Sequence, residues 1–322
     1  MRGPAVELWL HPEGAVPAAL VRDLGRRRGV DLTGLFGAEG DWHLPGPAAL
    51  LPACAAVAAA AGDPAGTLRL IRAAVEARAA EGVVHAELRL CPDWYGCGEL
   101  GPWREHLAAA AEALDGAETA VGISARIVVA APRGAGPERA RAAALCAAET
   151  AGPVVTGFAL AGADAPDCHA DFAWAFDCAR EAGLGLTAEA GAPHAVTEAV
   201  SELRLGRIAV SFPALADSAL LDRLAEQDIA LDLCPGADVA CGLCPRFSAH
   251  PINGVRSAGV RLALSSLAPE MLGAPLEWTR ERLADAFGWD ADVFRGIDRA
   301  AATAAFCDAD TRKRLLDRLE TP

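Results

Sequence analysis

Eight short apolar segments recur along the chain, and each is followed by a helical pattern. Strands that alternate with helices predict a parallel sheet. Eight of them within about 260 residues predict a closed barrel. We therefore expect a single (β/α)8 TIM-type barrel, as one domain over residues 1–322, with extra helices after the first strand (48–61 and 66–81) and in the tail (275–320). The expected strands cover 6–11, 83–90, 123–130, 154–160, 185–189, 207–211, 229–233 and 260–265.

Charge and composition narrow the class of protein. The 322 residues are 52% apolar, and a net charge of −14 argues against a nucleic-acid or anionic-membrane surface. The most apolar run, 48–61, contains Pro52 and is too short to span a bilayer. Ten cysteines without a secretory leader fit a reducing cytoplasm. We expect a cytoplasmic protein that takes a small molecule into the barrel mouth, and a homo-oligomer remains open.

The first strand places a histidine at the expected mouth. Apolar and polar residues alternate over 6–11, so Glu7, Trp9 and His11 are expected to share one face. In a barrel of this class the working residues sit at the C-terminal ends of the strands. His11 is there, either as a catalytic group or as an ordinary hydrogen-bonded histidine.

A carboxylate lies at the C-terminal end of the fifth expected strand. Glu189 would point into the barrel, where an unpaired charge is costly. It is either an acid/base with a raised pKa or a group neutralised by His11 or Arg89. Other strand-end candidates are Glu13, Cys91, Gly162, Val210, Ser211, Cys234, Ser265, Ser266 and Leu267.

Several segments, taken in order, resemble the adenosine deaminase family of metal-dependent hydrolases over nearly the whole chain. The order and spacing of the segments carry the resemblance. They are Glu7-Leu8-Trp9-Leu10-His11-Pro12-Glu13-Gly14, residues 82–92, 157–162 and 183–191, and then Arg207-Ile208, Cys234-Pro235, His250-Pro251 and Ala268-Pro269.

The resemblance also implies where this chain departs from the family. The family's His-x-His, two zinc ligands, matches Trp9 and His11. Its His-Ala-Gly-Glu, a third ligand and the acid/base, matches Glu189 and Ala192. A tetrahedral zinc site needs more ligands than His11 and Glu189 provide. No metal or other cofactor is therefore expected at the mouth.

Two further family positions are apolar here. The histidine that assists the attacking water matches Val210, and the paired aspartates match Leu267 and Ala268. Zinc lowers the pKa of water from 15.7 to about 7, on the order of 12 kcal/mol of activation as an upper bound. A carboxylate base supplies roughly 10²–10⁴-fold, about 3–5 kcal/mol. Orthodox zinc-dependent deamination is therefore expected to be absent.

The sequence thus predicts a metal-independent enzyme, repurposed for acid/base chemistry on a small, nucleoside-like or less polar metabolite and fitting specialised metabolism. Glu189 and His11 are the expected catalytic residues. The resemblance implies that Glu13 contacts a ribose and that Gly162 lies against a purine. Trp9 either fills the former metal void or stacks on a planar ligand. The expected substrate-binding residues are Trp9, Glu13, Arg89, Gly162, Val210 and Leu267.

Alternatives remain open at this point. One is a non-catalytic ligand-binding or regulatory protein. Another is a purine nucleoside deaminase with an unorthodox metal site of His11, Glu189 and either Cys91 or Cys234.

Smaller motifs are also ambiguous. The pairs Trp42-His43 and Trp94-Tyr95 either form a lid over a ligand or pack within their own loops. His194 either lies over the mouth or is a solvated loop residue. The spacing C-x6-C-x2-C marks free thiols or a structural metal site, at Cys234, Cys241 and Cys244.

Overall fold

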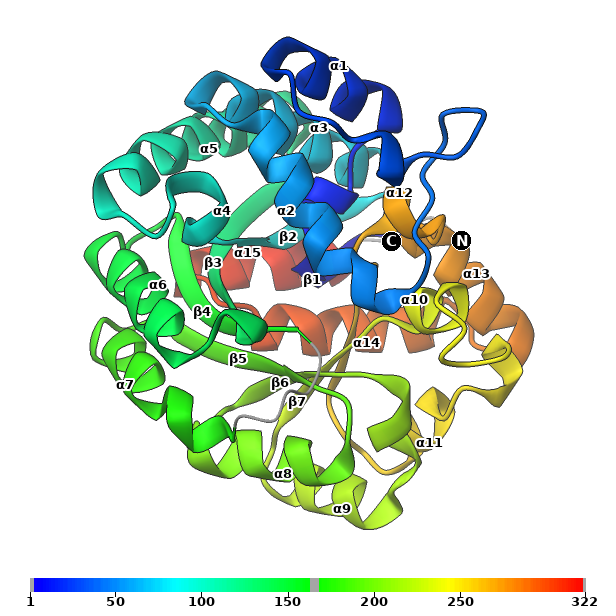
Figure 1. Ribbon diagram of the computed structural model, residues 1–322. Helices are drawn as coiled ribbons and strands as arrows, with labels where there is room; N and C mark the ends of the chain where they lie inside the picture. Colours follow the sequence, from blue (N-terminus) through cyan, green and yellow to red (C-terminus); the bar gives the residue numbers. More distant parts are fainter. Residues whose placement is uncertain (1–2, 163–167, 321–322) are drawn as a thin grey trace.

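Eight parallel strands form one sheet in which every strand pairs with the next along the chain. The computed structural model describes residues 3–162 and 168–320. Figure 1 shows the strands wrapped around a common axis with helices outside them, which confirms the expected (β/α)8 fold. The strands are β1 (Ala5–Leu10), β2 (Val83–Leu90), β3 (Ser124–Pro132), β4 (Val155–Ala161), β5 (Gly185–Ala190), β6 (Arg207–Val210), β7 (Ala230–Leu233) and β8 (Leu262–Leu264).

The helices include the extra ones expected after the first strand and in the tail. In Figure 1, α2 crosses in front of the barrel and α15 lies behind it. The helices are α1 (Ala18–Arg28), α2 (Leu50–Ala61), α3 (Pro64–Ala80), α4 (Pro92–Gly96), α5 (Leu100–Val121), α6 (Pro137–Glu149), α7 (Ala173–Glu181), α8 (Pro193–Glu202), α9 (Ser218–Glu226), α10 (Pro235–Ala240), α11 (Ile252–Ser257), α12 (Pro269–Leu272), α13 (Leu276–Phe287), α14 (Ala291–Ala304) and α15 (Ala309–Glu320). Within the described ranges, none of these helices combines the length and apolarity needed to cross a membrane.

One segment expected to be a loop is helical. Residues 92–96 form the short helix α4, which begins at Pro92. Proline suits the first position of a helix because its missing N–H would have no partner there. As a result Tyr95 is buried instead of forming part of an open lid.

The first strand is irregular, and this changes which side chains share a face. Its register against β2 shifts between Glu7 and Leu10. The two successive N–H groups of Leu8 and Trp9 both donate to Ser265 Oγ, at 3.1 and 3.0 Å. An extra residue is thus accommodated at this point of the strand, as in a β-bulge.

Glu7 consequently faces the helix layer. It pairs in register with Ala86, which belongs to the core beneath the helices. Its Oε1 accepts the N–H of Ser266 at 2.6 Å. Burial raises its pKa, and Arg78 of α3 acts in the opposite direction. The expectation that Glu7 shares a face with Trp9 and His11 is therefore wrong, because the bulge breaks the alternation.

The barrel closes between its last and first strands just beyond β8. The N–H of His11 donates to the carbonyl of Leu267 at 2.7 Å, and the N–H of Leu267 donates to the carbonyl of Trp9 at 3.2 Å. Leu267 adopts φ 66°, the left-handed region that costs a residue with a side chain roughly 1–2 kcal/mol. These two bonds hold the strained residue at the mouth.

Candidate functional site

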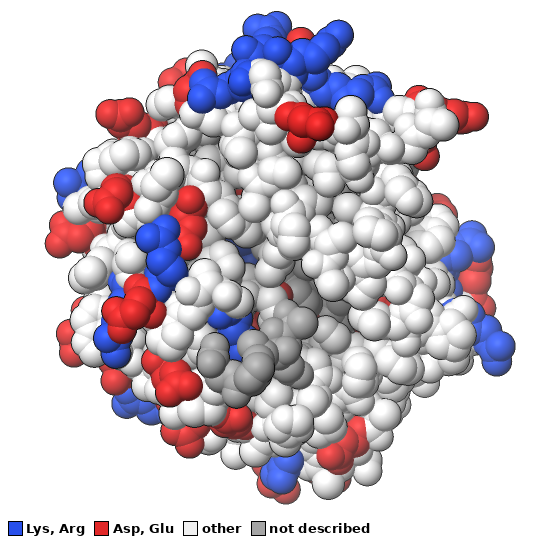
Figure 2. Space-filling model, in the orientation of Figure 1, with Lys and Arg blue, Asp and Glu red and all other residues white. Residues whose placement is uncertain are grey.

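A cavity of about 500 Å³ opens at the C-terminal ends of the strands. Figure 2 shows this face hollowed in the middle and surrounded mostly by uncharged residues, with Lys, Arg, Asp and Glu gathered toward the edge. Most of the lining is carbon, as is usual for a small-molecule site. The lining residues are Trp9, His11, Pro47, Ala48, Leu50, Leu51, Gly162, Glu189, Ala190, Gly191, Val210, Ser211, Pro213, Cys234, Ala237, Asp238, Cys241, Leu243 and Leu267.

The structure brings most of the predicted site residues to this one cavity. Glu13 and Arg89, two of the expected substrate-binding residues, are fully buried and do not line it, and neither do the strand-end candidates Cys91, Ser265 and Ser266. His194 is exposed and also lies outside the lining. The predicted catalytic and substrate-binding residues that line the cavity are Trp9, His11, Gly162, Glu189, Val210 and Leu267, and two further strand-end candidates, Ser211 and Cys234, line it as well.

Glu189 is held by two hydrogen bonds that the sequence did not reveal. Its Oε1 accepts the indole N–H of Trp9 at 3.0 Å, and its Oε2 accepts the backbone N–H of Gly162 at 2.7 Å. Burial raises the pKa of Glu189, while the Arg89 guanidinium, 3.8 Å away, and the two N–H donors favour the charged form. The carboxyl group is therefore fixed in orientation.

Gly162 can serve as that donor because of its backbone conformation. Its φ is 114°, a region that side chains rarely adopt, and an added Cβ would lie 3.1 Å from Leu51 Cδ1. The N–H is thereby aimed at Glu189 from the end of β4. A strand-end glycine was a visible signal, but its hydrogen-bond partner was not.

Trp9 lies between the cavity and the barrel interior. Its ring packs with Ala209, Cys234 and Ala237, and it stacks 5.4 Å from the Arg89 guanidinium. A cation over an indole face is attracted by the ring's electron density. The side chain thus fills the space beneath the cavity and anchors Glu189 through its N–H.

His11 is a neutral, unpartnered histidine in this site. Its Nε2 lies 3.9 Å from Glu189 Oε1, beyond hydrogen-bond reach, and neither ring nitrogen has a hydrogen-bond partner. Burial, together with Arg89, lowers its pKa to about 3. The positive charge beside Glu189 is therefore that of Arg89, not of His11.

Glu13 lies behind the cavity wall. Its Oε1 accepts the hydroxyl of Tyr95 at 2.6 Å, and its Oε2 has no hydrogen-bond partner. Burial raises its pKa to about 7, against the effect of the Tyr95 hydrogen bond. In this arrangement Glu13 cannot reach a ligand in the cavity without a rearrangement, so its expected ribose contact stays a prediction.

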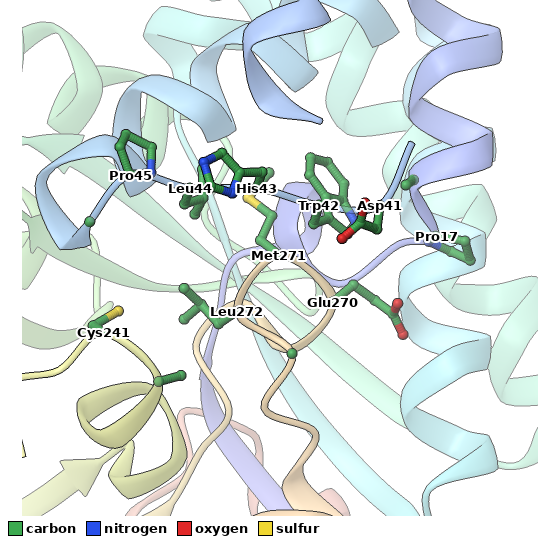
Figure 3. A pocket seen from close by; sticks show the side chains of 14 residues that line it. Pro17, Asp41, Trp42, His43, Leu44, Pro45, Cys241, Glu270, Met271 and Leu272 are labelled. Atoms are coloured by element: carbon green, nitrogen blue, oxygen red, sulfur yellow. The ribbon is translucent and has the colours of Figure 1, made fainter. Parts of the chain in front are cut away.

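A second groove, of about 650 Å³, lies beside the mouth between the segment 41–46 and α12. Figure 3 shows Trp42 and His43 on one side of it and Met271 and Leu272 on the other. The indole N–H of Trp42 donates to the carbonyl of Val16 at 3.2 Å. No strand residue of the described chain lines this groove, whereas barrel sites form at the C-terminal ends of the strands.

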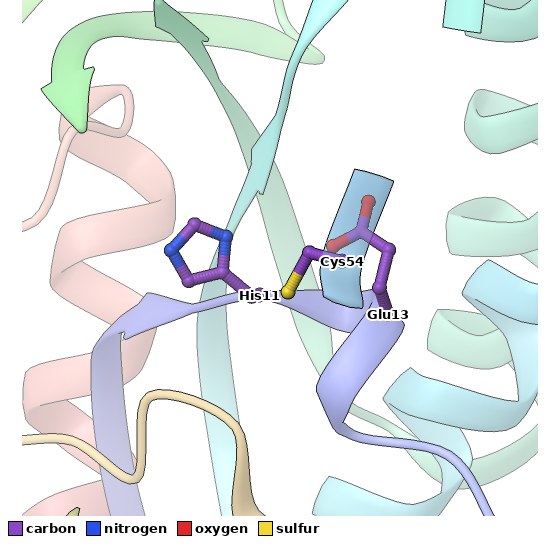
Figure 4. A group of neighbouring side chains, drawn as sticks. All are labelled: His11, Glu13 and Cys54. Carbon is purple, nitrogen blue, oxygen red and sulfur yellow. The ribbon is translucent and has the colours of Figure 1, made fainter. Parts of the chain in front are cut away.

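The structure describes one cluster of three possible metal ligands, and it is not a cluster that the sequence indicated. Ligand atoms of His11, Glu13 and Cys54 lie within 4.8 Å of one another, all in buried side chains (Figure 4). Among the described residues no such cluster joins His11 and Glu189 to Cys91 or Cys234.

The C-x6-C-x2-C motif is not a metal-ligand cluster in the described structure either. Cys234, Cys241 and Cys244 form no cluster of this kind in the described part of the chain, and all ten cysteines are free thiols. The structure thus gives no support to a structural metal site at these three residues.

Comparison with known proteins places the chain. The sequence model of the adenosine deaminase family matches residues 4–322. A protein of Agrobacterium fabrum named adenine deaminase is 37% identical over 317 residues, 97% of each chain. Another adenine deaminase, from Rhizobium leguminosarum bv. trifolii, is 36% identical over 98% of each chain. Among solved structures, an adenine deaminase from Arthrobacter aurescens superposes with a TM-score of 0.85 at 22% identity, covering 98% of each chain.

A structural likeness at 22% identity shows the fold alone. The curated relatives go further, because they are named for a deamination and match almost end to end. They contradict the expectation of a metal-independent enzyme repurposed for other chemistry, and equally its non-catalytic rival. Substituted residues at several family motifs did not justify either reading against similarity over the whole chain. The chain belongs to the adenosine deaminase family.

Proposed function

We propose that this chain is a hydrolytic deaminase that removes the exocyclic amino group of an adenine-type base held in the barrel mouth. The observation that carries the proposal is the end-to-end similarity to relatives named adenine deaminase. The reaction consumes water and the aminopurine, and it yields the oxo-purine and ammonia. The mouth cavity would take the base, and no nucleic-acid or membrane surface is required.

The cavity walls suit a flat, largely apolar ring. Trp9, Val210 and Leu267 present carbon surfaces to the cavity, and each is buried or nearly so. Gly162 leaves room at the end of β4, where a side chain would meet Leu51. A planar base would be fixed by these walls and oriented by the few polar groups among them.

Glu189 is the group proposed to move protons. Hydrolytic deamination protonates a ring nitrogen and the departing amine, and it deprotonates the attacking water. A carboxyl group with a raised pKa performs such transfers near neutral pH. Its bonds to Trp9 and Gly162 fix both oxygens, while the cavity gives a base access to the group. His11 lines the same cavity but is the weaker candidate, because its Nε2 lies 3.9 Å from Glu189 Oε1 and a pKa of about 3 makes it a poor proton acceptor near neutral pH.

We further propose that the chain is a divergent member of its family at the zinc centre. One relative of the same fold, an amidohydrolase from Burkholderia ambifaria, holds bound zinc (TM-score 0.86, 22% identity, covering all of this chain and 93% of that one). Here the side chains around Glu189 do not fit that ion: both carboxylate oxygens accept N–H groups, and Trp9 and Leu267 offer no ligand atom. No step is assigned to zinc at this place.

Ammonia release tests the proposal. The purified chain is expected to release ammonia from adenine, and Glu189→Gln should lower kcat about 10²–10⁴-fold with a smaller change in KM. Glu270→Gln, at a carboxylate in the neighbouring groove, is the matched control and should leave turnover unchanged.

Two outcomes would count against it. Absence of ammonia release from adenine and from other aminopurines would overturn the proposed reaction. Full turnover by Glu189→Gln would overturn only the role of Glu189.

We also propose a single-domain cytoplasmic enzyme, whose oligomeric state is either monomeric or homo-oligomeric. Ten free thiols support the compartment, since oxidising compartments favour disulfides. The single eight-stranded sheet supports one domain. Size measurement in solution would establish the oligomeric state.

A further inference from the structure

The cluster behind the mouth joins three elements of the chain. His11 follows β1, Glu13 lies in the turn after it, and Cys54 lies on α2. The three side chains are 1%, 0% and 0% exposed. Figure 4 shows them converging, with one nitrogen of the His11 ring on the side of Cys54 and Glu13.

Two of the three side chains carry polar atoms without a hydrogen-bond partner, and one of the two His11 nitrogens lies on the side of the cluster (Figure 4). Both ring nitrogens of His11 and Oε2 of Glu13 are buried without a hydrogen-bond partner. Buried polar groups in folded proteins are nearly always hydrogen-bonded, so three unpaired atoms from adjacent residues need an explanation. One bound cation would satisfy one His11 nitrogen and the Glu13 oxygen, because an imidazole nitrogen and a carboxylate oxygen are both metal ligands.

The set of donors is chemically coherent. Imidazole, carboxylate and thiolate together favour a borderline-soft divalent ion such as zinc. A thiolate and a carboxylate would also balance the two charges of that ion within a buried site. Ligand atoms on one tetrahedral zinc lie about 3.3–3.5 Å apart given the usual bond lengths. The observed separations, within 4.8 Å, need a contraction on the order of 1 Å.

We propose that His11, Glu13 and Cys54 bind one divalent metal ion of the zinc class, displaced from the mouth and tying α2 to the end of β1. The ion would give α2 a polar attachment at Cys54, in an otherwise alanine-rich apolar helix. Residues at the start of this helix, Leu50 and Leu51, line the mouth cavity. The ion would thereby fix the position of the segment that covers the mouth.

Metal binding by the whole chain tests this site without any substrate, so its result is separate from that of the proposed reaction. Metal-free protein titrated with cobalt(II) should develop a cobalt–thiolate charge-transfer band that saturates at one equivalent. Elemental analysis of protein purified without chelator should find about one zinc per chain. Zinc should also raise the Tm of the metal-free protein, because the ion binds the folded state.

Variants distinguish this site from other thiols. Cys54→Ser should abolish the cobalt–thiolate band, whereas Cys91→Ser, at another buried cysteine, should retain it. Glu13→Gln keeps the thiolate and should weaken binding at least tenfold with the band intact. This second variant keeps the test decisive if Cys54→Ser does not fold.

Failure is equally clear. Absence of a cobalt–thiolate band in the unmodified chain would overturn the proposal. A band that persists in Cys54→Ser, or an affinity unchanged in Glu13→Gln, would also overturn it.

Discussion

The two halves of the barrel interior handle buried charge differently. In the N-terminal half, Arg207 of β6 donates to both oxygens of Glu87 on β2 and lies 3.3 Å from Asp232 on β7. Its guanidinium stacks 3.7 Å from the ring of Phe306, whose N–H also donates to Glu87. In this half, one arginine therefore takes part in an ion pair, in hydrogen bonds and in packing against an aromatic ring.

The mouth half has the same kinds of group with fewer bonds between them. Arg89 has no hydrogen-bond partner for any of its three nitrogens, and neither has the ring of His11. Glu189 is held by Trp9 and Gly162, not by a direct bond to Arg89. The N-terminal half also contains buried polar atoms without a hydrogen-bond partner, in Asp232 and at Nε2 of His85. The contrast therefore lies in the two-pronged Arg207–Glu87 pair, which suits a role in stability, whereas at the mouth Arg89 and His11 make no such bond and remain available to a ligand or an ion.

The largest expected effect comes from breaking the N-terminal pairing. Arg207→Met keeps much of the side-chain volume but leaves Glu87 and Asp232 as uncompensated buried carboxyls. Removing one partner of a buried pair costs about 3–5 kcal/mol of unfolding free energy. Urea unfolding measures it, and the double variant Arg207→Met/Glu87→Gln should recover part of the loss. A loss below about 1 kcal/mol would contradict the assigned role.

The free energy of unfolding is also expected to depend on pH through His85, a buried titratable group in the same half. Its Nδ1 lies 2.7 Å from Ser124 Oγ, its Nε2 is unpartnered, and burial lowers its pKa to about 4. Between about pH 6.5 and 4 the unfolded chain therefore binds more protons, and stability falls as the pH falls. The loss approaches about 3 kcal/mol at the lower end.

His85→Gln isolates this contribution. The difference in urea midpoint between the two proteins should change across pH 4–6.5 and stay constant above it. Parallel curves throughout would show that His85 titrates normally in the folded state.

At the mouth a smaller loss is expected. Trp9→Phe keeps an aromatic ring over Arg89 but removes the N–H that donates to Glu189. Leaving a buried acceptor with one bond fewer costs about 1–3 kcal/mol. Trp42→Phe, which removes a bond from the partly buried Trp42 to Val16, is the control and should cost less. Equal losses would mean that the Trp9–Glu189 bond contributes nothing special.

The sequence predicted the barrel well because strand and helix patterns are local. It also placed Trp9, Glu189 and Gly162 at one mouth, since strand ends converge in such a fold. It failed at Glu7, where a bulge reversed the face, because bulges depend on a distant hydroxyl, that of Ser265. Hydrogen bonds across the barrel are not written in any local pattern.

The grouping of His11 and Glu13 with Cys54 was missed for a related reason. Cys54 lies in an alanine-rich helical run, where a lone cysteine resembles a small apolar residue. Only the packing of α2 across the barrel brings it to the end of β1. The inference of lost function had a different cause: it weighed single motif positions above similarity along the whole chain.

The smallest expected effect tests whether the surface pair Arg139–Asp93, called the rim pair below, supports the residues behind the mouth. Arg139 of α6 donates to both oxygens of Asp93, at 3.1 and 2.7 Å, and Asp93 lies on α4 two residues before Tyr95. Arg139→Lys keeps the charge but loses the two-pronged geometry, and because Arg139 is exposed the cost should be about 0.5–1 kcal/mol. If α4 positions Tyr95, amide exchange in α4 should rise more than in α6, where the substitution itself lies. Faster exchange confined to α6 would show that the rim pair does not hold α4, and that Glu13 keeps its hydroxyl donor without help from the surface.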